Sequence, residues 1–102
     1  MAYCLCTQVT LRMGQNQRRN EMMAKLVPYM ARQGWKLVLG LAPFLGDFCG
    51  LKHVWEIEQF SDIEKGLLKC YTDPEAAAIL APMGELLHNE EMQIMTKTPY
   101  SG

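Results

Sequence analysis

Four stretches of this chain have the pattern of β-strands, with β-forming side chains that fall on two alternating faces. They cover residues 3–12, 35–45, 49–60 and 91–97. Residues 15–33, between the first two stretches, carry apolar side chains three and four positions apart, which predicts an amphipathic helix. A second helix is predicted from Ser61 to about Tyr71, and shorter helical turns follow it to about His88. The predicted order of elements is therefore β-α-β-β-α-β.

This order is that of a ferredoxin-like fold, in which both main helices cover one face of a four-stranded antiparallel sheet. The other face of the sheet would expose several apolar side chains, and a patch of that kind usually marks an interface. Two such sheets packed face to face would form a two-fold dimer around a cavity. The length of 102 residues predicts a single domain over residues 1–102.

Two local signals concern the helices. Pro28 lies inside the first helical pattern and has no backbone N–H, which predicts a kink or a break at that point. Ser61 and Glu64 have the spacing of a capping box, in which each side chain accepts a hydrogen bond from a free amide of the first turn. They predict that the second helix begins at Ser61.

The third predicted strand carries an unusual mixture of side chains on both faces. One face would carry Leu51, His53, Trp55, Ile57 and Gln59, and the other Lys52, Val54, Glu56, Glu58 and Phe60. Neither set is purely apolar, so we expect this strand to border a cavity or an interface. Whether His53 or Glu56 faces that cavity stays open. A charged glutamate beneath the helices would be costly without a partner, which favours placing Glu56 in the cavity or near a strand end.

The composition excludes several classes of function. Ten basic and eleven acidic residues give a net charge of −1, which argues against a general nucleic-acid binder. The basic pair Arg18 and Arg19 is interpreted as a solvated helical turn. No apolar run is long enough to span a bilayer and the N-terminus lacks a signal peptide, so a cytoplasmic location is expected. The four cysteines match no zinc motif and are expected to be free thiols, so no metal or cofactor is predicted.

Several short motifs together resemble a known family. A glycine turn leads into His53-Val-Trp-Glu-Ile57, where the family tends to show His-Leu-Trp-Glu-Tyr. Gly34 precedes a Lys-Leu-Val strand, and residues 73–75 read Asp-Pro-Glu. The ending from Asn89 to Met95 is also similar. In this order and spacing the motifs resemble the NIPSNAP-type family of the dimeric α/β-barrel superfamily, which implies a ferredoxin-like fold and a homodimer.

The chain also departs from that family's pattern. Where members often begin with Glu-Leu-Arg-x-Tyr, the matching positions here are Leu5, Cys6, Thr7 and Val9. Cys49-Gly50 replaces an Asn-Gln pair, and Ala76 replaces a tryptophan. The resemblance therefore implies a pocket that has lost most of its usual charged and amide groups. The wider superfamily includes cofactor-free monooxygenases, haem-degrading enzymes, polyketide cyclases and isomerases, so the fold constrains function weakly.

The predicted site centres on the third strand. His53 and Glu56 are the candidate catalytic residues, because an imidazole titrates near neutrality and a carboxylate can also move a proton. A buried, hydrogen-bonded histidine is the structural alternative for His53. The candidate substrate-binding residues are Trp55, Tyr29, Trp35, Cys49 and Met92. Core packing is the alternative for each aromatic residue, and an inert thiol for Cys49.

We therefore predict a small cofactor-independent enzyme of specialised metabolism. It would cyclise or isomerise a hydrophobic polyketide-like or aromatic substrate, which the pocket would fold into a reactive conformer. His53 or Glu56 would move the proton. The alternatives are a non-catalytic protein that binds a hydrophobic small molecule, and a cofactor-free or haem-linked monooxygenase.

Overall fold

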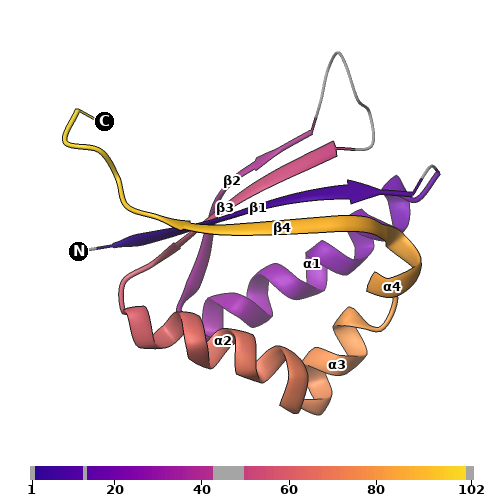
Figure 1. Cartoon of the computed structure of the whole chain (residues 1–102). Coiled ribbons are helices and arrows are strands. Elements are labelled where there is room, and N and C mark those ends of the chain that lie inside the picture. The colour runs from indigo at the N-terminus through magenta and orange to yellow at the C-terminus, as the bar shows by residue number, and fades with distance from the viewer. Residues whose placement is uncertain (1, 13, 43–49, 101–102) are drawn as a thin grey trace.

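The computed structural model describes residues 2–12, 14–42 and 50–100, without the side chains of residues 87 and 88. Its strands are β1 (Tyr3–Leu11), β2 (Trp35–Leu41), β3 (Gly50–Ile57) and β4 (Leu87–Met95). Its helices are α1 (Asn16–Arg32), α2 (Phe60–Thr72), α3 (Pro74–Leu80) and α4 (Met83–Leu86). Figure 1 shows α1, α2 and α3 together on one side of the sheet. None of the described helices or strands covers the other side of the sheet.

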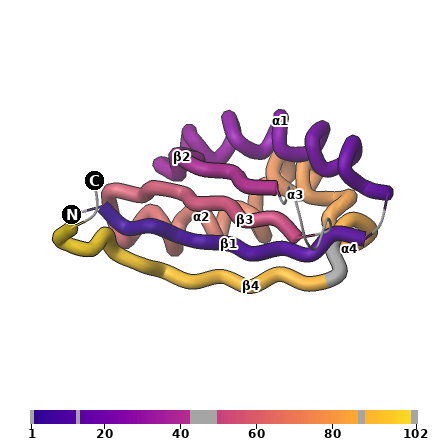
Figure 2. Tube along the Cα trace, turned by 90° about the horizontal axis from the view of Figure 1, so that it is seen from above, coloured from indigo at the N-terminus to yellow at the C-terminus, as the bar shows by residue number. Residues whose placement is uncertain are grey.

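The sheet has the order β2-β3-β1-β4, and all three pairings are antiparallel. Figure 2 shows the four strands side by side in this order. This is the ferredoxin-like arrangement, so the predicted fold class is confirmed. The strand ends differ from the predictions. β3 ends at Ile57 rather than 60, and β4 covers 87–95 rather than 91–97.

The strand register decides which side chains of β3 lie under the helices. Trp55 stands opposite Leu5, and His53 stands opposite Thr7. Residues directly opposite each other project to the same face of a sheet. Leu5 and Trp55 are buried in one core cluster with α1 side chains such as Met30. The face that carries His53 and Trp55 therefore packs under the helices.

Of the kink or break predicted at Pro28, the break does not occur. The helix runs from Asn16 to Arg32 with Pro28 inside it. A proline removes the N–H that would bond to the carbonyl four residues earlier, here that of Ala24. Ala24 and Pro28 are both exposed, so water can reach that carbonyl. The helix is held instead by its opposite, buried side.

Helix α2 begins one residue before the predicted start. Its first residue is Phe60, its N-cap is Gln59, and no side chain makes a capping hydrogen bond. The predicted capping box of Ser61 and Glu64 is therefore wrong. The ring of Phe60 packs edge-on against Tyr3 of β1, with centroids 5.4 Å apart. This contact fixes the start of the helix by packing rather than by capping.

The uncovered face of the sheet contains apolar residues. The β2–β3 register shifts between Leu37 and Leu39, so Leu37 pairs with Trp55 whereas Leu39 pairs with Val54. The shift places Leu39 and Leu41 on the uncovered side, where both are exposed. We refer to this surface, with Val54, as the open face.

Candidate functional site

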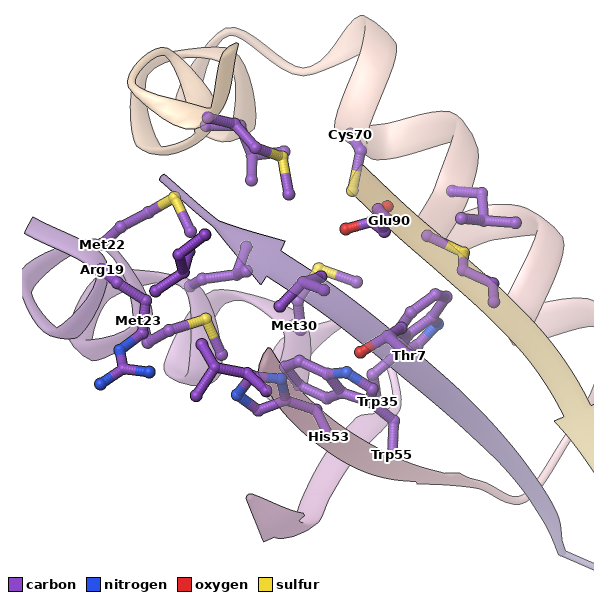
Figure 3. Close-up of a pocket in the computed structure, with 18 of the residues that line it drawn as sticks. Thr7, Arg19, Met22, Met23, Met30, Trp35, His53, Trp55, Cys70 and Glu90 are labelled. Carbon is purple, nitrogen blue, oxygen red and sulfur yellow. The ribbon is translucent and has the colours of Figure 1, made fainter. Parts of the chain in front are cut away.

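A cavity of about 280 Å³ lies between the sheet and the helices. Figure 3 shows side chains from both layers pointing into it. Most of the lining is apolar, and it includes five of the chain's eight methionines: Met22, Met23, Met30, Met83 and Met92. Thioethers adapt easily to irregular shapes, so this wall can fit around a ligand of uneven outline.

Two tryptophans form one end of the cavity. Trp35 of β2 and Trp55 of β3 both line it, and their rings meet edge to face with centroids 6.0 Å apart. The indole nitrogen of Trp35 donates a hydrogen bond of 2.7 Å to the backbone oxygen of Asp62. This bond holds the Trp35 ring in place, so the pair makes a firm aromatic wall.

His53 is half-buried and lines the same cavity. Burial, and secondarily the positive charge of Arg19, lower the pKa of His53. Both effects disfavour the cationic imidazolium, so the ring is neutral at neutral pH. A neutral imidazole has one nitrogen free to accept a proton. The site therefore presents a base next to an apolar space.

A second, smaller cavity of about 220 Å³ lies on the far side of His53. It shares Arg19 and His53 with the larger cavity, and it is also lined by Asn20 and Gly40. A Cβ atom on Gly40 would lie 3.5 Å from Cδ2 of His53. Glycine at this position leaves the edge of the imidazole uncovered. His53 and Arg19 thus stand at the junction of two spaces.

Four further residues with polar groups line the larger cavity: Thr7, Cys70, Tyr71 and Glu90. Burial raises the pKa of Glu90. Burial, followed by the nearby Glu90 carboxylate, raises the pKa of Cys70. A raised pKa leaves less thiolate at neutral pH, so Cys70 is not an activated nucleophile. Figure 3 shows Cys70 and Glu90 close together, away from His53 and Arg19.

Arg19 was missed as a site residue by the sequence interpretation. Arg18 is exposed and fits the predicted solvated turn, but Arg19 is half-buried and lines both cavities. The sequence does contain one indication that Arg19 faces inward, which is its spacing from the methionines of the same helix. Arg19 precedes Met22 and Met23 by three and four residues, which places it on the inward face of α1.

The other predicted site residues lie in different places. Met92 lines the cavity, whereas Glu56 projects to the open face and pairs with Lys97 at 3.5 Å. Tyr29 is buried in the core and donates a hydrogen bond to Asp73. Cys49 lies outside the described residues. Of the two catalytic candidates, His53 is therefore the one that lines the cavity.

Within the described ranges, no group of three histidine, cysteine, aspartate or glutamate side chains is placed to hold a metal ion. Across the same ranges, no helix combines the length and apolar character needed to cross a membrane.

Solved structures with the same fold cover almost the whole chain. A NIPSNAP family protein from Agrobacterium tumefaciens superposes with a TM-score of 0.86 at 17% identity, over 99% of this chain and 97% of that one. The chain shares the ferredoxin-like fold of this NIPSNAP family protein. A NIPSNAP-like domain protein from Burkholderia xenovorans gives a TM-score of 0.81 at 14% identity, over 99% and 89% of the two chains.

A structure with a different name shares the fold as well. A candidate antibiotic biosynthesis monooxygenase from Nitrosomonas europaea gives a TM-score of 0.76 at 10% identity, over 99% of this chain and 94% of that one. No protein-family profile matches the sequence, and no curated protein sequence matches it significantly. At these identities the likeness shows the ferredoxin-like fold alone, and the function has to be argued from the site.

Proposed function

We propose that this protein binds a compact molecule with an apolar body in the cavity between sheet and helices and moves a proton on it without a cofactor. The observation that carries the proposal is the position of His53, a neutral base on the wall of a mostly apolar cavity. A base surrounded by apolar side chains can act on a bound carbon acid away from bulk water.

The size of the cavity limits the ligand. Small-molecule sites usually measure about 300–1,000 Å³, and the cavity of about 280 Å³ found here lies just below that range. The aromatic wall of Trp35 and Trp55 favours a flat, unsaturated body. An aromatic or polyketide-like molecule with about one or two rings fits both features.

The proposed step is proton transfer next to a carbonyl group. The C–H bond breaks, its proton forms an N–H bond on the imidazole of His53, and the electron pair moves to the carbonyl oxygen as an enolate. Return of the proton to a different carbon completes an isomerisation. Alternatively, the enolate carbon attacks a second carbonyl and closes a ring, and the alkoxide that forms takes the proton back from His53. Neither outcome needs an oxidant or a metal.

The test uses 1-acetonaphthone, a neutral aromatic ketone, and follows deuterium uptake into its methyl group by NMR in D2O. We expect the protein to accelerate exchange over buffer, and His53→Asn to lower the enzymatic rate by about 10²–10⁴-fold, the usual contribution of a general base. Calorimetry should show nearly unchanged affinity. Glu56→Gln is the matched control, because Glu56 lies on the open face and should leave the rate unchanged.

Each other result has a definite meaning. Binding without accelerated exchange would identify a carrier of small apolar molecules rather than an enzyme. Unchanged exchange in His53→Asn would remove His53 from the mechanism. Loss of exchange in Glu56→Gln would transfer the role to the open face. Absence of binding would contradict the proposed use of the cavity.

We also propose that the protein forms a homodimer through the open face. Leu39 and Leu41 are exposed there beside Val54, and covering them would remove apolar surface from water. Glu56 and its partner Lys97 would then lie near the seam between two sheets.

A further inference from the structure

The guanidinium of Arg19 is a charged group beside the cavity to which the proposed function assigns no role. The other three arginines, Arg12, Arg18 and Arg32, are exposed, and two of them pair with carboxylates. Arg19 is half-buried on the inward face of α1 and makes no ion pair with any carboxylate among the described residues. A partly desolvated cation without an anion is unfavourable unless something else neutralises it.

The hydrogen bonds of Arg19 to other described residues involve Nε and leave its two terminal nitrogens available. Its Nε donates a hydrogen bond of 2.8 Å to Oδ1 of Asn20, the next residue on the helix. The two terminal nitrogens make no hydrogen bond to the residues that the structure describes. A guanidinium held at Nε presents these nitrogens as a fork, the arrangement that binds both oxygens of a carboxylate.

The position of Arg19 relates this fork to the proposed reaction. Arg19 and His53 line both the larger and the smaller cavity. Figure 3 shows the two side chains at the same end of the site, with Glu90 elsewhere on its wall. An anion bound at this junction would keep an attached ring system in the larger, apolar cavity. The carbon next to that ring would then lie beside His53.

We infer that the ligand is an aromatic or polyketide-like carboxylate, whose carboxylate pairs with Arg19 while its apolar body fills the larger cavity. This inference rests on the proposed function and specifies its substrate class. The side-chain oxygen of Asn20 accepts the bond from Nε and so restrains the guanidinium beside the cavities that Arg19 lines.

The experiment compares two ligands of nearly equal shape and different charge, 2-naphthoate and 2-naphthamide, by titration calorimetry. We expect wild-type protein to prefer the naphthoate. Arg19→Met should weaken naphthoate binding by about ten- to a hundredfold, the range for a charge-assisted hydrogen bond. The same change should alter naphthamide binding by less than about threefold. Naphthoate affinity should also fall as salt is added.

Arg18→Met is the matched control. Arg18 is the neighbouring arginine, but its guanidinium is exposed and pairs with Glu85 at 2.8 Å. Its replacement should leave the affinity for both ligands unchanged. Arg19→Lys keeps the charge but loses the fork and should give an intermediate affinity. Circular dichroism and Tm of each variant report whether the fold is retained.

A neutral two-ring probe, the 1-acetonaphthone of the first test, separates failure of this inference from failure of the proposed function. Equal affinity of wild-type protein for naphthoate and naphthamide would overturn the inference. An equal loss of affinity for both ligands in Arg19→Met would also overturn it. Absence of naphthoate binding to wild-type protein would do the same. If the probe still binds in any of these cases, the apolar cavity stands and only the carboxylate partner is wrong. If wild-type protein binds neither the probe nor the two naphthyl ligands, both proposals fail.

Discussion

The phenol of Tyr29 connects three helical segments at the level of single side chains. Its hydroxyl donates a hydrogen bond of 2.7 Å to Oδ2 of Asp73, while Oδ1 of Asp73 accepts one from the backbone N–H of Glu75. Asp73 thereby caps α3 and joins it to α1. Arg32 pairs with Glu75 and places its guanidinium 5.3 Å from the centre of the Tyr29 ring. These contacts therefore hold α1 and α3 together at the point where α2 ends.

Removing this hydroxyl should destabilise the protein in a pH-dependent way. Burial, followed by the hydrogen bond to Asp73, raises the pKa of Tyr29 to about 12. An unfolded tyrosine titrates near pH 10. The stabilisation is therefore complete below about pH 10 and is lost as the pH rises through about 12. We expect Tyr29→Phe to lower the Tm by about 4–8 °C near pH 7.

Thermal unfolding of both proteins across the pH range checks this prediction. The difference in Tm between wild type and Tyr29→Phe should shrink between pH 10 and 12. It should also shrink in acid, because the hydrogen bond from Tyr29 lowers the pKa of Asp73 and its benefit is lost as that carboxylate gains a proton. Tyr71→Phe is the control, because Tyr71 is 86% exposed. A Tm difference independent of pH would contradict the assigned bond.

The sequence predicted some site residues and missed others for physical reasons. His53 and Trp55 stood out because a polar ring and a large aromatic alternate on one strand. The sequence could not decide between His53 and Glu56, because both faces of β3 are mixed and the choice depends on pairing with β1. Arg19 was hidden because its charge suggests solvent. Only its spacing to Met22 indicates the inward face.

At the scale of elements, the position of α2 is set by a close approach to the sheet. Gly66 is buried in α2 against the indole ring of Trp35. A Cβ atom at this position would lie 2.5 Å from Cε2 of that ring, well inside contact distance. The same ring donates its N–H to the backbone of Asp62, one turn earlier in the helix. The ring of Trp35 thus sets both the distance of α2 from the sheet and its position over the sheet.

Replacing Gly66 by alanine should therefore destabilise the protein, although alanine is the better helix former. We expect Gly66→Ala to reduce the free energy of unfolding by about 1–3 kcal/mol, the usual effect of overpacking. Chemical denaturation measures this. Gly84→Ala in α4 is the control, because a Cβ there meets nothing within 4 Å. It should be neutral or slightly stabilising. Equal effects of the two changes would show that helix propensity, and not the Trp35 contact, decides.

Element order was predictable because periodicity and glycine punctuation both mark it. Element ends were less predictable, since packing overrides local signals. Phe60 joins α2 through its contact with Tyr3, so the capping pattern at Ser61 goes unused. Pro28 stays within α1 because it falls on the exposed side of the helix. Both deviations follow from tertiary contacts that a short sequence window does not contain.

At the scale of the whole molecule, the two faces of the sheet are unequal. One face has three helices over it and encloses the cavity, while the open face has no layer on it among the described residues. Leu39 and Leu41 owe their place on the open face to the register shift in β2. An apolar surface on an edge strand invites association with another chain. The proposed homodimer would cover it without closing the cavity on the opposite face.

The dimer leads to a prediction about mass in solution. Light scattering at micromolar concentration should give twice the chain mass of 11.6 kDa for wild-type protein. Leu39→Glu should weaken association by more than about tenfold, because a charge would be buried between two apolar faces. Leu68→Glu is the matched control. Leu39 and Leu68 are 47% and 60% exposed in the single chain, so neither change should disturb its fold.

The outcomes distinguish a dimer interface on the open face from one elsewhere on the surface. A dimer that dissociates in Leu39→Glu but persists in Leu68→Glu would place the interface on the sheet, because Leu68 lies on α2. Dissociation in Leu68→Glu alone would place it on the helical layer. A monomeric wild-type protein would exclude a stable dimer through the open face. In that case the exposed leucines of β2 would need another partner, while the cavity under the helices would remain complete within one chain.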